Sequence, residues 1–260
     1  MKAIILAAGQ GTRLKKYTEN LPKGMLEFAG KTIIERQLET YRKCGIEDIS
    51  LVTGFAADKI QYAGVKYYKN IEFETTNMVE SLLTAQEEFV EDCIVSYSDV
   101  LFEEGMLKKM MDENGDFCVA VDDEWKSYWK MRYGREDFDT ESLSIGENDS
   151  IIELGKVDPP IESIDARYIG LLKFSSGGLS EIVDVMDDAH RYYSDKPWQQ
   201  SGKPAKKAYM TDLLNALIEK GELVKAVHFQ HGWIEFDTNE DYESAIDWKQ
   251  SGKIKAVIDI

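Results

Sequence analysis

Lys2-Ala-Ile-Ile-Leu-Ala-Ala-Gly-Gln-Gly-Thr-Arg-Leu14 is the stretch from which the fold can be read. Its apolar first half runs into a glycine turn, which predicts a buried strand. Gly9 and Gly11 have no Cβ atoms, so backbone N–H groups there can approach a ligand closely. Arg13 and Lys23 would bring two cations to the same place. We expect this loop to hold a triphosphate, the alternative being a purely structural turn.

Two familiar phosphate-loop patterns do not fit the glycines. A dinucleotide-binding fingerprint needs a third glycine where Leu14 stands. A Walker loop fits at Gly30-Lys31-Thr32, but its first glycine is replaced by Met25. The loop therefore belongs to neither class.

Beyond the loop, helical and strand patterns alternate. A helix is predicted over residues 33–43 and a buried strand over 49–52, which together with the first strand make a right-handed βαβ unit. Further strands are predicted over 65–68, 93–97 and 117–121, with helices over 78–89 and 106–111. This alternation predicts an α/β fold with a doubly wound, mostly parallel sheet and helices on both faces. Ligands of such sheets bind at the carboxyl ends of the strands, where Gly9, Gly54 and Asp99 lie.

The pattern of apolar and charged residues changes at Asp122. We therefore expect a single domain, residues 1–260, that consists of a first half, 1–121, and a second half, 122–260. The second half is expected to contain a small acidic hairpin or insertion over 136–150 and a mobile loop over 190–207. Its predicted strands are 151–156, 168–174, 224–229 and 233–236, and its predicted helices are 180–186, 209–220 and 241–249.

Two aspartates are candidate metal ligands. Asp99 and Asp237 each follow a predicted strand, so their carboxylates could meet over a phosphate and hold Mg²⁺, which prefers oxygen ligands. The alternative is that each aspartate only caps a turn.

The composition limits the class of partner. A formal net charge of −17 disfavours binding to nucleic acid or to anionic membranes. No apolar run approaches the roughly 20 residues of a membrane-spanning helix. Three scattered cysteines, Cys44, Cys93 and Cys118, suggest free thiols in a reducing compartment. We expect a cytoplasmic protein without a signal peptide.

Residues 6–14 with Pro22-Lys23 resemble the signature L-A-A-G-x-G-[ST]-R-L … P-K of the sugar-1-phosphate nucleotidylyltransferase and phosphocholine cytidylyltransferase superfamily. The resemblance implies a Rossmann-like nucleotidyltransferase fold, with Asp99 and Asp237 in the places of the metal-binding aspartates. It also implies that Asn77 and Ser81 read the nucleobase, although Asn77 also suits a helix N-cap. The nucleotide-binding residues would be Leu6, Ala7, Ala8, Gly9, Gly11, Thr12, Arg13, Lys23, Thr76, Asn77, Met78, Ser81 and Ser98.

A resemblance to a smaller group of enzymes within this superfamily is found in the segments 121–129, 151–156, 166–174 and 209–220. These are similar to cytidylyltransferases that use L-glutamine phosphate in the capsule phosphoramidate pathway. The similarity implies CTP as donor and a small phosphorylated acceptor. We expect Trp125, Trp129, Lys156 and Tyr168 to contact the acceptor; the alternative for the tryptophans is core or lid packing.

The expected reaction is a Mg²⁺-dependent, in-line attack of the acceptor phosphate on the α-phosphorus of CTP. Its catalytic residues would be Arg13, Lys23, Asp99 and Asp237. No general base is needed, because the attacking phosphate is already ionised. Alternatives are phosphocholine, aminophosphonate or sugar-1-phosphate acceptors, or a nucleotide-binding module without turnover. The oligomeric state stays open, a homodimer being one alternative.

Overall fold

A computed structural model describes residues 1–260 and contains a seven-stranded sheet in the order β12-β8-β11-β6-β1-β4-β5. All neighbours pair in parallel except β11, which runs antiparallel to both β6 and β8. The predicted doubly wound, mostly parallel sheet is therefore confirmed. Its strands are β1 (Lys2–Ala7), β4 (Ile49–Thr53), β5 (Lys66–Lys69), β6 (Cys93–Tyr97), β8 (Phe117–Asp122), β11 (Arg167–Phe174) and β12 (Val224–Phe229).

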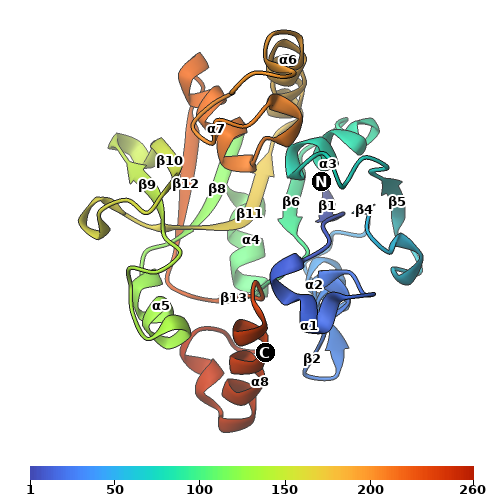
Figure 1. Cartoon of the computed structure of the whole chain (residues 1–260), viewed down its shortest axis with the longest axis vertical. Coiled ribbons are helices and arrows are strands. Elements are labelled where there is room, and N and C mark those ends of the chain that lie inside the picture. The colour runs from blue at the N-terminus through green and yellow to red at the C-terminus, as the bar shows by residue number, and fades with distance from the viewer.

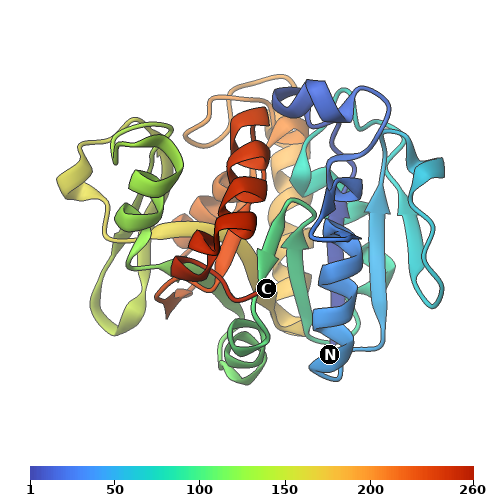
Figure 2. The same ribbon diagram turned by 90° about the horizontal axis from the view of Figure 1, so that it is seen from below.

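Helices cover both faces of the sheet (Figures 1 and 2). Side chains alternate along β1, so that Ala3 and Ile5 pack into one apolar core and Ile4 and Leu6 into the other. The first core is closed by α2 (Ile33–Lys43), α4 (Glu104–Asp112), α5 (Trp125–Tyr133) and α8 (Asn239–Ser251). The second is closed by α3 (Met78–Thr84), α6 (Ser176–Tyr193) and α7 (Met210–Lys220). A short helix, α1 (Lys15–Thr18), follows the glycine loop.

Three small antiparallel sheets complete the fold: β2 (Glu27–Phe28) with β3 (Lys31–Thr32), β7 (Val100–Phe102) with β13 (Trp233–Glu235), and β9 (Glu141–Ile145) with β10 (Ile151–Val157). The β7–β13 pair matters most for the site. Glu235 lies opposite Val100, and the Phe236 N–H donates to the Asp99 carbonyl oxygen over 2.9 Å. This register brings Asp237 beside Asp99 although more than a hundred residues separate them in the chain.

Two predicted helices have different lengths in the structure. The helix predicted over 78–89 ends at Thr84, and a separate 3₁₀ turn, Gln86–Glu88, follows it. The helix predicted over 180–186 extends over Ser176–Tyr193, so the expectation of a loop beginning at His190 is wrong. The Ser175 side chain caps this helix by accepting from the Gly178 N–H over 3.0 Å. Buried residues at helical spacing, Leu179, Ile182, Met186 and Ala189, then carry the helix onward.

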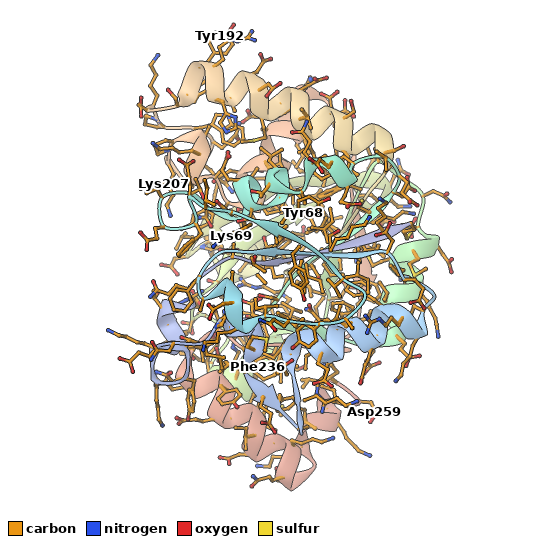
Figure 3. All side chains as sticks on the ribbon, turned by 90° about the vertical axis from the view of Figure 1, so that its right-hand side faces the viewer. Tyr68, Lys69, Tyr192, Lys207, Phe236 and Asp259 are labelled. Carbon is orange, nitrogen blue, oxygen red and sulfur yellow. The ribbon has the colours of Figure 1, made fainter.

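The rest of the expected loop is held by polar contacts. Buried Asp212 accepts hydrogen bonds from the backbone N–H groups of Ser201 (3.1 Å) and Tyr209 (2.9 Å). At its far end the Lys207 carbonyl oxygen accepts from Asn77 Nδ2 over 3.4 Å, which places this segment against the start of α3. Figure 3 views the molecule from the β5 edge and labels Lys207 there. None of the helices combines the length and the apolar character that a membrane-spanning segment requires.

Candidate active site

The glycine loop after β1 is shaped by close backbone contacts. Gly11 has a left-handed backbone (φ +64°), which glycine adopts without strain. The Thr18 hydroxyl donates to the Gly11 carbonyl oxygen over 2.8 Å and ties the loop to α1. A Cβ on Gly54 would lie 2.7 Å from the Ala8 carbonyl oxygen, whereas a Cβ on Gly9 would meet nothing within 4 Å. Gly54 is thus required by packing, while Gly9 faces open space.

One cavity lies at the carboxyl ends of β1 and β6 and collects the predicted catalytic residues and nearly all the predicted nucleotide-binding residues. Every predicted nucleotide-binding residue except Ala7 lines it, together with Asp99 and Asp237. Ala7 instead packs into the core below. The cavity also includes Phe73 and Tyr97, which the sequence analysis missed. Tyr97 directly precedes the Ser98-Asp99 pair at the end of β6, a position that could have suggested it.

Two cations and two carboxylates meet at the mouth of this cavity. Lys23 Nζ lies 2.5 Å from Asp99 Oδ2 and 2.7 Å from Asp237 Oδ1. Arg13 Nη2 lies 2.5 Å from Asp237 Oδ2. Side-chain exposure is low for Lys23 (12%), Asp237 (14%) and Asp99 (22%), whereas Arg13 (59%) remains open to solvent. The convergence expected for these four residues is present.

The charges in this cluster stabilise one another. Burial lowers the pKa of Lys23, but Asp99 and Asp237 outweigh it and the net pKa is raised. Burial raises the pKa of Asp237, but Lys23 and Arg13 outweigh it and the net pKa is lowered. At neutral pH Lys23 is therefore protonated and Asp237 is ionised.

The carboxylate oxygens of this cluster suit a divalent cation that is bound partly by the protein and partly by oxygens of a substrate. Asp99 Oδ1 is buried and has no hydrogen-bond partner, so a lone carboxylate oxygen is available inside the cluster. The chain offers no group of three or more His, Cys, Asp or Glu side chains that could hold a metal alone. A cation bound here would need further oxygens from water or phosphate, which is how Mg²⁺ commonly binds.

The start of α3 forms the far wall of the cavity. Asn77 caps this helix, its Oδ1 accepting from the Met78 N–H over 2.9 Å. Ser81 Oγ accepts from Asn70 Nδ2 over 3.1 Å and donates to the Asn77 carbonyl oxygen over 3.3 Å. The capping alternative is thus present in the structure, while both side chains also face the cavity.

The structure contradicts the predicted acceptor contacts of both tryptophans. Trp125 and Trp129 are 1% and 0% exposed and pack edge to face in the core under α5. Trp129 Nε1 donates to the Phe138 carbonyl oxygen over 2.8 Å, so even its polar atom is used internally. Aromatic side chains at helical spacing bury large apolar areas, which explains why the core alternative holds.

Lys156 and Tyr168 also lie outside the cavity lining. Lys156 is on β10, where its Nζ pairs with Glu153 over 3.1 Å beside a different hollow. The structure does not bring Lys156 together with the nucleotide-binding residues, and its contact with the acceptor stays a prediction. Tyr168 lies behind the lining residue Tyr97, and the Tyr168 hydroxyl donates to the Tyr97 hydroxyl over 2.9 Å. Tyr168 therefore supports a lining residue rather than lining the cavity itself.

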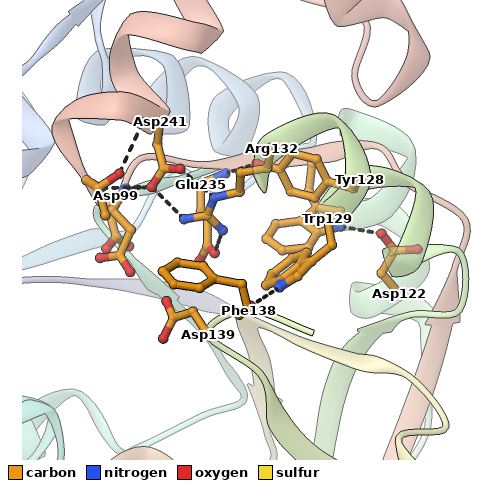
Figure 4. A network of polar contacts seen from close by, with 12 residues as sticks. Asp99, Asp122, Tyr128, Trp129, Arg132, Phe138, Asp139, Glu235 and Asp241 are labelled. Carbon is orange, nitrogen blue, oxygen red and sulfur yellow. Dashed lines mark hydrogen bonds and ion pairs between the residues drawn. The ribbon is translucent and has the colours of Figure 1, made fainter. Parts of the chain in front are cut away.

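A buried arginine that the sequence analysis missed, Arg132, supports the segment that carries Asp237, and Figure 4 shows this arginine with Glu235 and Asp241. Arg132 on α5 donates from Nε and Nη2 to the two oxygens of Asp241, each over 2.6 Å, and also pairs with Glu235. Asp241 in turn accepts from the N–H groups of Thr238 (2.8 Å) and Asp237 (3.2 Å). No local sequence pattern distinguishes a single arginine in a charge-rich stretch, so only the fold reveals the contacts from Arg132 through Asp241 to Asp237.

The carboxylates of Glu235 and Asp241 determine the pKa of Arg132. Burial lowers its pKa, but Glu235 and Asp241 outweigh burial and raise it. For Glu235 burial dominates instead, and its pKa is raised although Arg132 and Arg167 oppose the change. Arg167, on β11, is thus close enough to act on the segment that leads into Asp237.

A glycine loop after the first strand and a lysine-bridged pair of aspartates across a mixed sheet define a nucleotidyltransferase. Residues 3–150 match the MobA-like NTP transferase domain family, and the chain belongs to this family.

The relatives with named activities include cytidylyltransferases and a UTP--glucose-1-phosphate uridylyltransferase of Haloferax volcanii. The chain is 34% identical over 260 residues to CTP:phosphoglutamine cytidylyltransferase of Campylobacter jejuni, covering 95% of this chain and 100% of that protein. It is 32% identical over 149 residues to choline-phosphate cytidylyltransferase of Streptococcus pneumoniae, covering 56% of this chain and 64% of that one.

Solved structures support the fold. CTP:phosphocholine cytidylyltransferase from S. pneumoniae superposes with a TM-score of 0.71 at 23% identity, covering 95% of this chain and 97% of that one. The inositol-1-phosphate CTP transferase from T. maritima gives the same TM-score at 19% identity, covering 100% and 98%.

Proposed function

We propose that the protein is a Mg²⁺-dependent cytidylyltransferase that transfers CMP from CTP to a small phosphorylated acceptor and releases pyrophosphate. The observation that carries this proposal is the meeting of Arg13, Lys23, Asp99 and Asp237 in one cavity. L-glutamine phosphate is the favoured acceptor, because the relative matching 95% of the chain is named for it. A place in capsule phosphoramidate synthesis and a cytoplasmic location belong to the same proposal.

The chain's own residues would act by positioning and by neutralising charge. The acceptor phosphate oxygen attacks the α-phosphorus of CTP in line, and the bond to pyrophosphate breaks. Arg13 and the N–H groups of the loop at Gly9 and Gly11 would hold the leaving phosphates. Lys23 would steady the α-phosphate or the acceptor. Mg²⁺, held by Asp99 and Asp237, would supply polarisation of the α-phosphate.

A substrate panel tests the reaction. Pyrophosphate release is measured with CTP, UTP, dTTP and GTP, each combined with L-glutamine phosphate, phosphocholine, 2-aminoethylphosphonate and glucose-1-phosphate. We expect the highest kcat/KM for CTP with L-glutamine phosphate. A preference for UTP with glucose-1-phosphate would contradict cytidylyl transfer. A preference for CTP with phosphocholine would contradict only the proposed acceptor and would leave cytidylyl transfer unchanged.

The metal assignment is tested by Asp99→Asn, which keeps the size of the side chain and removes its charge. We expect pyrophosphate release to fall by about 100-fold or more, as for other losses of transition-state charge stabilisation. Asp187→Asn, at an exposed position on α6, is the matched control and should retain activity. Circular dichroism checks that both variants fold. Near wild-type turnover by the Asp99 variant would show the assignment to be wrong.

A further inference from the structure

Arg167, the first residue of β11, is an arginine without a partner. Its side chain makes no hydrogen bond or ion pair in the chain, and its Nε and Nη1 atoms are buried and unpaired. Buried donors are nearly always satisfied, because leaving them unpaired after removal from water is unfavourable. An unpaired guanidinium therefore points to a missing ligand.

The nearby carboxylates are already engaged elsewhere. Asp122, opposite Arg167 in the β11–β8 register, accepts from Trp233 Nε1 and from the N–H groups of Glu124 and His231. Glu235 is paired with Arg132. Neither residue forms an ion pair with Arg167, although an ion pair would be the ordinary way to satisfy it.

The side chain of Arg167 is also held in a fixed orientation by an aromatic ring. Its guanidinium carbon lies 4.5 Å from the centre of the Trp129 ring, and the buried ring restricts the plane of the guanidinium. The next residue, Tyr168, bonds to Tyr97 of the cavity lining. Arg167 is not itself a lining residue, but its charge acts on Glu235, two residues before the lining residue Asp237, so it lies behind the part of the wall that Asp237 forms.

We propose that Arg167 binds a carboxylate of the acceptor, and this inference rests on the proposed cytidylyl transfer. A planar guanidinium matches a carboxylate with two parallel hydrogen bonds, whereas it would repel the trimethylammonium group of phosphocholine. The acceptor class is thus a small phosphate that carries a second, carboxylate anion at its other end.

The test compares wild type, Arg167→Gln and Arg167→Lys with CTP and two acceptors. One is L-glutamine phosphate, and the other is phosphorylated 4-aminobutanamide, which lacks the carboxylate. For Arg167→Gln we expect the KM for L-glutamine phosphate to rise about 10- to 100-fold, as for a lost charged hydrogen bond, with the KM for CTP unchanged. For the acceptor without a carboxylate, variant and wild type should have the same KM. Arg167→Lys should lie between them.

Arg191→Gln, an exposed arginine on α6, is the control and should match wild type. The melting temperature of Arg167→Gln should stay within about 4 °C of wild type, because the arginine has no internal ion pair to lose. An unchanged KM for L-glutamine phosphate in that variant would overturn the inference, as would equal increases for both acceptors, which would indicate phosphate binding instead. Wild type that uses only phosphocholine would overturn the inference and leave cytidylyl transfer intact. Absence of release with every acceptor would overturn both.

Discussion

At the scale of single residues, the proposed centre is electrically balanced. Lys23 contacts both Asp99 and Asp237, and Arg13 contacts Asp237. A magnesium–triphosphate carries charges of both signs, so it could replace each of these internal pairs by an external one. A chain with a net charge of −17 can in this way present an anion-binding site without leaving cations unpaired.

Glu88 gives a prediction for the pH dependence of stability. It is 3% exposed, and hydrogen bonds from Lys2, Tyr68 and Lys66 outweigh its burial and lower its pKa to about 2. Because the pKa is depressed on folding, the stabilisation is present above about pH 4.5 and is lost as the pH falls towards 2. It amounts to about 3 kcal/mol.

Urea unfolding at several pH values between 3 and 6 measures this effect. Glu88→Gln should have a flatter dependence of unfolding free energy on pH than wild type. Glu87→Gln, at the exposed neighbour, should retain the wild-type dependence. If the Glu88 variant kept the full dependence, other carboxylates would account for it.

At the scale of elements, α5 has a different role from the one that its aromatic residues suggest. Trp125 and Trp129 fill the core, while Arg132 reaches through it to the first turn of α8. Helix α8 begins with a capping box in which Thr238 and Asp241 satisfy each other's backbone. The arginine thus connects α5, through Asp241, to the backbone of Asp237.

Replacing this arginine should affect both stability and turnover. Arg132→Met leaves Glu235 and Asp241 without their cation, and we expect a loss of about 3–5 kcal/mol, as for broken buried pairs. Because Asp237 also loses its support, pyrophosphate release should fall at temperatures where the variant is still folded. Thermal unfolding and a single-temperature rate measure the two effects separately.

Lys130→Met is the matched control, since Lys130 pairs only at the surface of the same helix, with Glu136. It should change stability by less than about 1 kcal/mol. An Arg132→Met protein as stable as this control would contradict the proposed role of the buried cluster.

At the scale of the whole molecule, the two halves share one sheet. Strand β11 of the second half lies between β6 and β8 of the first, and β13 pairs with β7 across the same boundary. Neither half can complete its sheet alone, so we propose that residues 1–260 fold as one unit.

One cooperative unfolding transition is expected for the whole chain. All five tryptophans lie after residue 122, so their fluorescence reports on the second half, whereas far-ultraviolet circular dichroism reports on both. Urea transitions followed by the two signals should coincide. Two separated midpoints would show that the halves unfold independently, as would a folded fragment of residues 1–121.

Sequence reasoning succeeded where the deciding pattern is local. The strand before Gly9, the helix over Ile33–Lys43 and the strand over Val224–Phe229 were predicted at or near their observed bounds, because apolar periodicity is set by neighbouring residues. It failed where partners are distant in the chain. Trp129 was assigned to the acceptor, although its surroundings are fixed by the packing of α5 against other elements.

By itself, the sequence determined the class of fold and the approach of the glycine loop, Lys23 and Asp99 to one edge of a sheet. These follow from strand order and from residues close to strand ends. Only the tertiary structure decided that Asp237 reaches this edge through the β7–β13 register, that Arg132 supports it, and that Arg167 is left without a partner. The first two depend on contacts between segments more than a hundred residues apart, and the third depends on residues tens of positions away, so no local pattern encodes them.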